Sequence, residues 1–286
     1  MRNNFIALPE TICFRVTRFC NARCGFCLAP SDGAHPDVST LIARVDWLRT
    51  NGVRTIHFCG GEPTIHPGLA QLLEHVHAVG GKTRLTTNGI SLPEQVLDVI
   101  KARRTIVKVS IHGDRDNHDR LVGRSAFDLA TGNLRRMLSV SVDASIQTTV
   151  VAGGEGVVVW MASYCASLGV RRLSILPFIP RGSGLGRRGE YELTPPERRS
   201  LREIVNRLRK IYSGRVEIRW LDFTAKPVPV MEADGRVLLE GPTEAMDRVI
   251  AQFAPPTPSS STALKTASPS VELYPFSVPN SLGLAQ

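Results

Sequence analysis

The chain has 286 residues, 42% of them hydrophobic, and is long enough to enclose one large core. No apolar run approaches the roughly 20 residues that span a membrane, and the first residues lack the apolar stretch of a secretory signal. The net charge of +9 comes from scattered arginine pairs on expected helix faces, which argues against nucleic acid and favours a small anionic partner.

Apolar residues alternate with polar ones over 11–17, which predicts a strand. The helical spacing over 38–48 predicts a helix that ends at Asn51-Gly52. The same strand–helix unit then repeats. The later strands are expected over 55–59, 83–87, 106–111, 144–151 and 172–177, and the helices over 69–76, 93–100, 126–138 and 157–168. Such alternation indicates an α/β protein with a parallel sheet and helices outside it.

The remaining sequence predicts a small α+β extension. Thr194-Pro195-Pro196-Glu197 is a capping box that opens a helix, a strand follows over 216–220, and Asp234-Gly235 marks a hairpin turn. A last short helix is expected over 243–253. We therefore divide the chain into a core of residues 1–190, an extension of residues 191–253, and a Pro/Ser/Thr-rich tail of residues 254–286 that we expect to be disordered.

Three thiols lie close together directly after the first strand, at Cys20, Cys24 and Cys27. Iron–sulfur clusters usually take four cysteine thiolates, so three of them leave one iron open for a ligand. An open position is typical of catalytic metal sites. The alternative is a zinc site completed by a distant Cys or His. Six cysteines in this arrangement do not indicate a disulfide framework, and a thiolate-bound cluster suits the reducing cytoplasm, where we expect the protein.

Further motifs end later strands, namely Gly60-Gly61-Glu62-Pro63, Thr86-Thr87-Asn88-Gly89 and Val109-Ser110-Ile111-His112-Gly113. Together with the cysteine loop they resemble the radical S-adenosylmethionine (radical SAM) superfamily, in the branch that includes MoaA and the peptide maturases. The resemblance covers residues 11 to about 182. It implies an open, partial (β/α)6 TIM-type barrel, whose chemistry lies at the carboxyl ends of the strands.

The resemblance also implies the cofactors, a 4Fe-4S cluster on the three cysteines and SAM bound at its open iron. The implied SAM contacts are Phe26, Gly61, Glu62, Asn88, Ser110 and Ile179. A tight turn is the alternative for the glycine motif, and local loop capping is the alternative for Asn88 and Ser110. The arginine that often follows His118-Asp119 in related maturases is Val122 here. An external one-electron reductant of the flavodoxin or ferredoxin kind is the implied partner.

Period-two alternation places Arg15, Arg84 and Lys108 in the lumen of such a barrel. Isolated buried cations are costly, so an anionic substrate is expected to balance them, with internal salt bridges as the alternative. Cys59 faces the same lumen and is expected to be a small core residue rather than a hydrogen-atom donor.

The resulting hypothesis is a single-cluster radical SAM enzyme that removes a hydrogen atom from a small anionic metabolite such as a nucleoside, sugar or amino acid. A peptide-modifying maturase is the second hypothesis, and a non-catalytic iron–sulfur electron carrier is the third. The Gly-Gly-Glu-Pro motif argues against the third, because an electron carrier does not need a SAM pocket.

Overall fold

The computed structural model describes residues 8–29, 33–224, 226–254 and 271–273. Within this part of the chain, one sheet of eleven strands has the order β11-β10-β9-β8-β1-β2-β3-β4-β5-β6-β7. The strands are β1 (Thr11–Arg15), β2 (Thr55–Cys59), β3 (Lys82–Thr87), β4 (Ile106–Ser110), β5 (Ala144–Val150), β6 (Arg172–Pro177), β7 (Glu217–Trp220), β8 (Val228–Met231), β9 (Arg236–Glu240), β10 (Arg248–Phe253) and β11 (Val271–Leu273).

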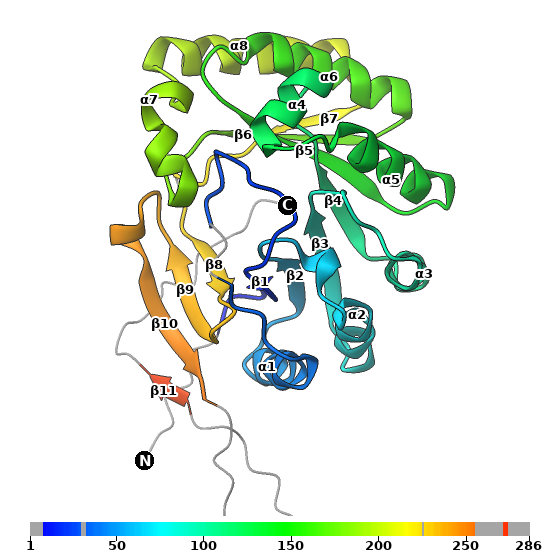
Figure 1. The fold of residues 1–286 in the computed structure, drawn as a ribbon, viewed down its shortest axis with the longest axis vertical. Helices are drawn as coiled ribbons and strands as arrows, with labels where there is room; N and C mark the ends of the chain where they lie inside the picture. The colour runs from blue at the N-terminus through cyan, green and yellow to red at the C-terminus, as the bar shows by residue number, and fades with distance from the viewer. Residues whose placement is uncertain (1–7, 30–32, 225, 255–270, 274–286) are drawn as a thin grey trace, which may run out of the picture.

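Helices cover the outer side of the curved sheet (Figure 1). The helices of the described residues are α1 (Val38–Thr50), α2 (Leu69–Ala78), α3 (Glu94–Ala102), α4 (Arg115–Val122), α5 (Phe127–Ser139), α6 (Glu155–Leu168), α7 (Arg188–Tyr191) and α8 (Pro195–Ile211), and the short 3-10 turns are η1 (Pro63–Ile65), η2 (Gly182–Arg187) and η3 (Glu244–Met246). The predicted partial barrel of alternating strands and helices is confirmed.

Strands β1 to β7 are parallel and each pairs with the next along the chain. Ile12 and Phe14 of β1 lie opposite Ile56 and Phe58 of β2, and all four side chains are fully buried beneath the helices. The residues between them point into the lumen. The carboxyl ends of the six core strands therefore meet at one mouth, as barrel geometry requires.

The extension adds strands at both edges of this sheet. The predicted strand at 216–220 is β7, parallel to β6, and the predicted hairpin is β8 and β9, of which β8 is parallel to β1. The predicted capping box of α8 is formed by Thr194 and Glu197. The division at residue 190 stays a prediction, and the strands on its two sides belong to one sheet.

The helix predicted over 243–253 is wrong. Only Glu244–Met246 turns, and Arg248–Phe253 is strand β10, antiparallel to β9. Ala251 and Phe253 are buried, and the Phe253 ring packs against Trp47 of α1. Burial of every second residue is strand periodicity, which the short apolar run did not reveal.

Two further segments differ from the expectation or fall outside it. Helix α4 was not predicted, because six of its eight residues are polar and it has no apolar periodicity. The expected disordered tail lies outside the described residues, apart from Ala254 and β11, which pairs antiparallel with β10. In the described ranges, no helix is long and apolar enough to cross a membrane.

Candidate active site

The cysteine loop is aligned with the end of β2 by backbone hydrogen bonds. Gly61 N–H donates to the Thr17 carbonyl at 2.8 Å, and Glu62 N–H donates to the Phe19 carbonyl at 2.8 Å. A Cβ on Gly61 would lie 2.0 Å from the Phe19 oxygen, and Gly60 has a φ of +151°. Only glycine fits this approach of two backbones. Cys20 is thereby placed directly beside the Gly-Gly-Glu motif.

Glu62 joins three parts of the mouth through its buried carboxylate. Oε1 accepts hydrogen bonds from the Thr64 backbone N–H at 3.0 Å and from the Thr64 and Thr87 hydroxyls, each at 2.6 Å. Oε2 accepts the Asn88 backbone N–H at 2.7 Å. Burial raises the pKa of Glu62, and these hydrogen bonds oppose that shift. Glu62 therefore fixes the end of β3 against the end of β2, and its contact with SAM stays a prediction.

Asn88 connects the end of β3 to the cysteine loop. Its amide nitrogen donates to Asn21 Oδ1 at 2.7 Å and lies 3.9 Å from Cys20 Sγ, while its oxygen accepts the Ile90 N–H at 2.9 Å. The expected capping of the loop is thus present. It leaves Asn88 beside the first cysteine, where a bound cofactor would meet it.

Helix α4 supports the loop from a second side. The carbonyls of Leu121 and Val122 accept the backbone N–H groups of Gly25 and Arg23, at 3.3 and 3.0 Å. Arg124 donates to the Asn21 carbonyl at 2.6 Å. The valine that replaces the expected arginine is therefore part of the loop's support.

The three cysteines are free and half-buried. Burial raises the pKa of Cys20 to about 11 and that of Cys24 to about 12, and the charges of the neighbouring cysteines add to the shift in Cys24. The charges of the neighbouring cysteines contribute to the raised pKa of Cys20 and Cys24, and a bound cation would deprotonate such thiol ligands. Among the described residues, no group of three or more His, Cys, Asp or Glu side chains is arranged to hold a metal ion.

The other expected SAM contacts lie around the same mouth. Phe26 stacks edge-on against the His112 ring at 4.6 Å and packs on a cluster that includes Phe178 and Tyr191. Ser110 is the last residue of β4 and is half-buried. Ile179 follows β6 and is buried. Its backbone carbonyl accepts a 2.9 Å hydrogen bond from the Arg181 N–H, and a contact of this carbonyl with SAM would compete with that bond.

A small cavity at the end of β5 was missed by the sequence reasoning. Its volume is about 60 Å³, and its lining includes Leu121 of α4, Thr149 of β5 and Gly153-Gly154. Gly153-Gly154 follows β5 as Gly60-Gly61 follows β2, and this similarity in the sequence could have identified the end of β5 as a candidate site. The cavity lies at the strand ends, where ligands of parallel-sheet proteins bind.

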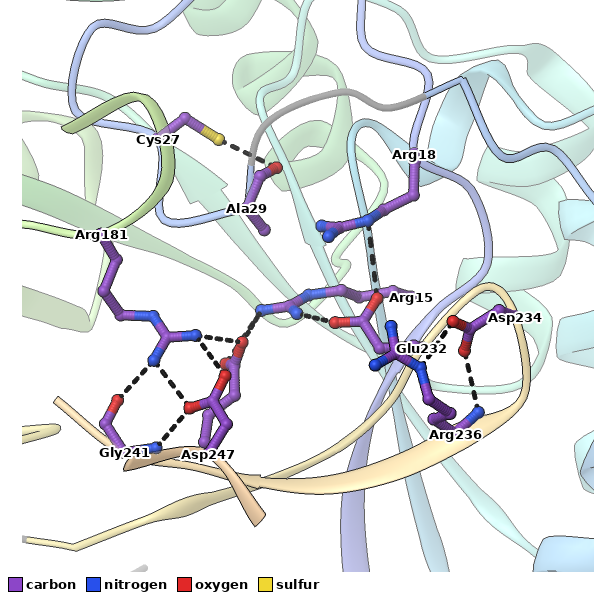
Figure 2. A network of polar contacts seen from close by, with 11 residues as sticks. Arg15, Arg18, Cys27, Ala29, Arg181, Glu232, Asp234, Arg236, Gly241 and Asp247 are labelled. Carbon is purple, nitrogen blue, oxygen red and sulfur yellow. Dashed lines mark hydrogen bonds and ion pairs between the residues drawn. The ribbon is translucent and has the colours of Figure 1, made fainter. Parts of the chain in front are cut away.

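Arg15 is the main correction to the expected lumen. It is not an isolated cation, because it forms ion pairs with Glu232 and, at 2.8 Å, with Glu240. Burial alone would lower the pKa of Arg15, but the two carboxylates raise it. Figure 2 shows Arg18 approaching Glu232 from the side of Cys27, at 3.5 Å in the ion pair. Internal salt bridges, the alternative to a substrate anion, are therefore right for Arg15.

The network continues to the far side of the hairpin. Arg181 pairs with Asp247 at 2.8 Å and with Glu240 at 3.3 Å, and it also donates to the Gly241 carbonyl (Figure 2). Residues from the core and the extension thus neutralise each other at the edge of the mouth. The sequence did not identify the carboxylate partners of Arg15, because Glu232 and Glu240 are more than 200 residues from it along the chain.

Lys108 differs from Arg15. Its side chain lies in the lumen, where burial lowers its pKa and the charges of Arg84, Arg219 and Arg172 add to this shift, while the Cys13 thiol opposes it. Within the described part of the chain, Lys108 has neither a hydrogen bond nor an ion pair with a carboxylate. Arg84, expected beside it, is exposed. The lumen therefore retains one half-buried ammonium group without a carboxylate partner among the described residues.

The sequence of the chain is similar to those of known proteins. Residues 14–157 match the family model of the Radical SAM superfamily. A curated relative, named GTP 3',8-cyclase, from Chlorobaculum tepidum, is 32% identical over 48% of this chain and 44% of its own length. A second, named PqqA peptide cyclase, from Streptomyces rochei, is 22% identical over 84% of this chain and 68% of its own.

The fold also matches a solved structure, that of Streptococcus suis SuiB bound to precursor peptide SuiA. The TM-score is 0.71 at 16% identity, over 82% of this chain and 60% of the other. The chain thus spans less than half of the cyclase and about three fifths of SuiB.

Proposed function

The chain belongs to the radical SAM superfamily, and on that premise we propose that it removes a hydrogen atom from a small anionic metabolite, such as a nucleoside, sugar or amino acid. The cofactors of the family are a 4Fe-4S cluster and SAM, which supply a 5'-deoxyadenosyl radical after transfer of one electron. What this chain contributes is the placement of both groups and of the substrate, in a reducing compartment, the cytoplasm.

Cys20, Cys24 and Cys27 would hold the cluster, as the only thiols of the described residues that lie on one loop at the mouth. The cofactor side of the mouth would be formed by Phe26, Gly61, Glu62, Asn88, Ser110 and Ile179. The support for this assignment is that Glu62 and Asn88 are hydrogen-bonded to Phe19 and Asn21, the two residues that flank Cys20. SAM bound there would lie above the lumen.

The observation that carries the substrate class is Lys108. Lys108 is half-buried and has no carboxylate partner among the described residues, whereas the nearby Arg172 and Arg219 already pair with Asp143 and Glu217. An anion that joined Lys108 in the lumen would therefore stabilise its charge. Arg15, by contrast, is already neutralised and offers nothing to a ligand. A phosphate or carboxylate of the substrate would pair with Lys108 beneath the mouth.

A peptide substrate is the second candidate. It is favoured by the relative named PqqA peptide cyclase, whose match covers 84% of this chain. A peptide could offer Lys108 an Asp or Glu side chain, so both candidates share the same anionic group. An electron carrier without turnover is the least supported candidate. The close approach of Gly60 and Gly61 to the backbone before Cys20, which we call the glycine cradle, is needed to bind SAM but not to carry electrons.

The external reductant is proposed to be an acidic flavodoxin- or ferredoxin-like carrier. Arg23 and Arg124 are exposed at the cysteine loop and would attract it. Reduction of the cluster should then weaken as salt is raised, because exposed charges are screened.

The test has two stages. Anaerobically purified protein with its cluster reduced by dithionite should convert SAM to 5'-deoxyadenosine, whereas an electron carrier would form none. Binding of inorganic phosphate and of short carboxylates is then measured for the intact protein and for Lys108→Gln, with the exposed helix variant Lys101→Gln as the matched control. Lys108→Gln should weaken anion binding about tenfold or more. Equal binding by both variants would refute the anionic substrate.

A further inference from the structure

Two cysteines outside the cluster loop lie together in the lumen. Cys13 of β1 is opposite His57 of β2, and Cys59 is opposite Arg15, one step closer to the mouth. Their neighbours Ile12, Phe14 and Phe58 are fully buried on the outer face, so the two thiols are on the inner one. Cys59 is the last residue of β2 and directly precedes the glycine cradle.

The thiols end a chain of polar groups that crosses three strands. The Thr86 hydroxyl lies 2.7 Å from His57 Nε2, and Cys13 is the neighbour of His57 in the register of β1 and β2. Cys59 lies two residues beyond His57 on the same inner face. Such a series of neighbouring polar groups can pass a proton to Cys59.

The two thiols are not equivalent. The hydrogen bond to Cys59, aided by His57, lowers the pKa of Cys13, while the same bond and burial raise the pKa of Cys59. Cys59 therefore keeps its proton at neutral pH. A protonated thiol is a poor nucleophile but a good source of hydrogen atoms, because its S–H bond is weaker than most C–H bonds.

We propose that Cys59 donates a hydrogen atom to a carbon radical in the lumen, and that Cys13 and His57 restore its proton. The S–H bond breaks homolytically, a C–H bond forms, and Cys59 becomes a thiyl radical. One electron from the external one-electron reductant converts the thiyl to a thiolate, and a proton from solvent reaches it through Thr86, His57 and Cys13. The substrate would gain a solvent-derived hydrogen at the carbon that was attacked.

This inference rests on the proposed function, and one experiment separates the two. The intact protein is equilibrated in D₂O, so that thiols carry deuterium, and is given SAM and dithionite without substrate. The nucleoside radical must then take its hydrogen from the protein. We expect 5'-deoxyadenosine with one added deuterium from the wild type and from the control variant Cys165→Ala, which changes a buried residue of α6.

The outcomes are distinct. Any 5'-deoxyadenosine formed by Cys59→Ser should lack the deuterium. Unlabelled product from the wild type, or labelled product from Cys59→Ser, would overturn the donor role and leave the proposed function standing. Absence of 5'-deoxyadenosine from a protein that holds its iron would overturn both.

A second measurement does not depend on turnover. Iodoacetamide labelling of Cys13 at pH 7, located by mass spectrometry, reports its acidity. Cys59→Ala should slow this labelling about fivefold or more, because it removes the hydrogen bond that stabilises the Cys13 thiolate. Cys165→Ala should leave the rate unchanged, and equal rates in all three proteins would contradict the thiol pair.

Discussion

The ion pair between Arg15 and Glu232 gives the sharpest test of how the extension is joined to the core. Both side chains are more than 90% buried, and a second carboxylate, Glu240, completes the site. Replacing Arg15 by leucine leaves two buried carboxylates without their main partner. Breaking such a pair from one side costs about 3–5 kcal/mol.

The size of this effect can be measured by urea unfolding followed by tryptophan fluorescence. With a slope of about 3 kcal/mol per molar urea, Arg15→Leu should lower the midpoint by about 1–1.7 M. The matched control is Arg103→Leu, which removes a pair with Glu74 in which both side chains are at least 40% exposed. The control should change stability by no more than about 1 kcal/mol.

The double variant Arg15→Leu with Glu232→Leu distinguishes a lost pair from a general packing defect. Two apolar side chains of similar volume often replace a buried pair without loss, so the double variant should be less destabilised than the two single variants together, by about 2 kcal/mol or more. Additive losses, or a loss for Arg15→Leu no larger than that of Arg103→Leu, would refute the reasoning.

Three further predictions concern the mouth. Burial holds the pKa of His118 at about 4, below its ordinary 6.5, so neutral His118 stabilises the fold above pH 6.5 and this contribution is lost as pH falls towards 4. His118 should account for about 2 kcal/mol of the stability lost between pH 7.5 and pH 5, so in urea unfolding the pH dependence of His118→Gln should be smaller by about that amount. Gly61→Ala should cost about 2–3 kcal/mol and lower the iron content, whereas Gly156→Ala, with no atom near its added Cβ, should be neutral or stabilising. Cys24→Ser should lose iron measured after anaerobic purification, and Cys165→Ala should keep it.

The core could be predicted from sequence because its periodic patterns are local. Polar residues alternate with the buried side chains of Ile12, Phe14, Ile56 and Phe58. The motifs at the strand ends can also be identified from a few consecutive residues. The turn at Asp234-Gly235 was found for the same reason, since Gly235 has a φ of +93° that a hairpin turn requires.

The errors arose where distant residues decide the outcome. Residues 248–253 form strand β10 because they pair with β9 and because Phe253 packs on Trp47. Neither contact can be predicted from these six residues alone. Likewise, alternation placed Arg15 in the lumen correctly but could not show that Glu232 and Glu240 would meet it there. Side-chain direction is a local property, whereas the partner of a buried charge is a property of the whole fold.

These partners change what the lumen can recognise. Had Arg15, Arg84 and Lys108 all been open, a ligand with several negative charges would have been needed to balance them. Since the extension neutralises Arg15 and solvent screens Arg84, a single anionic group suffices for Lys108. If the proposed function is right, a substrate with one phosphate or carboxylate should therefore bind more tightly than a triphosphate, because the carboxylates of the extension already neutralise Arg15.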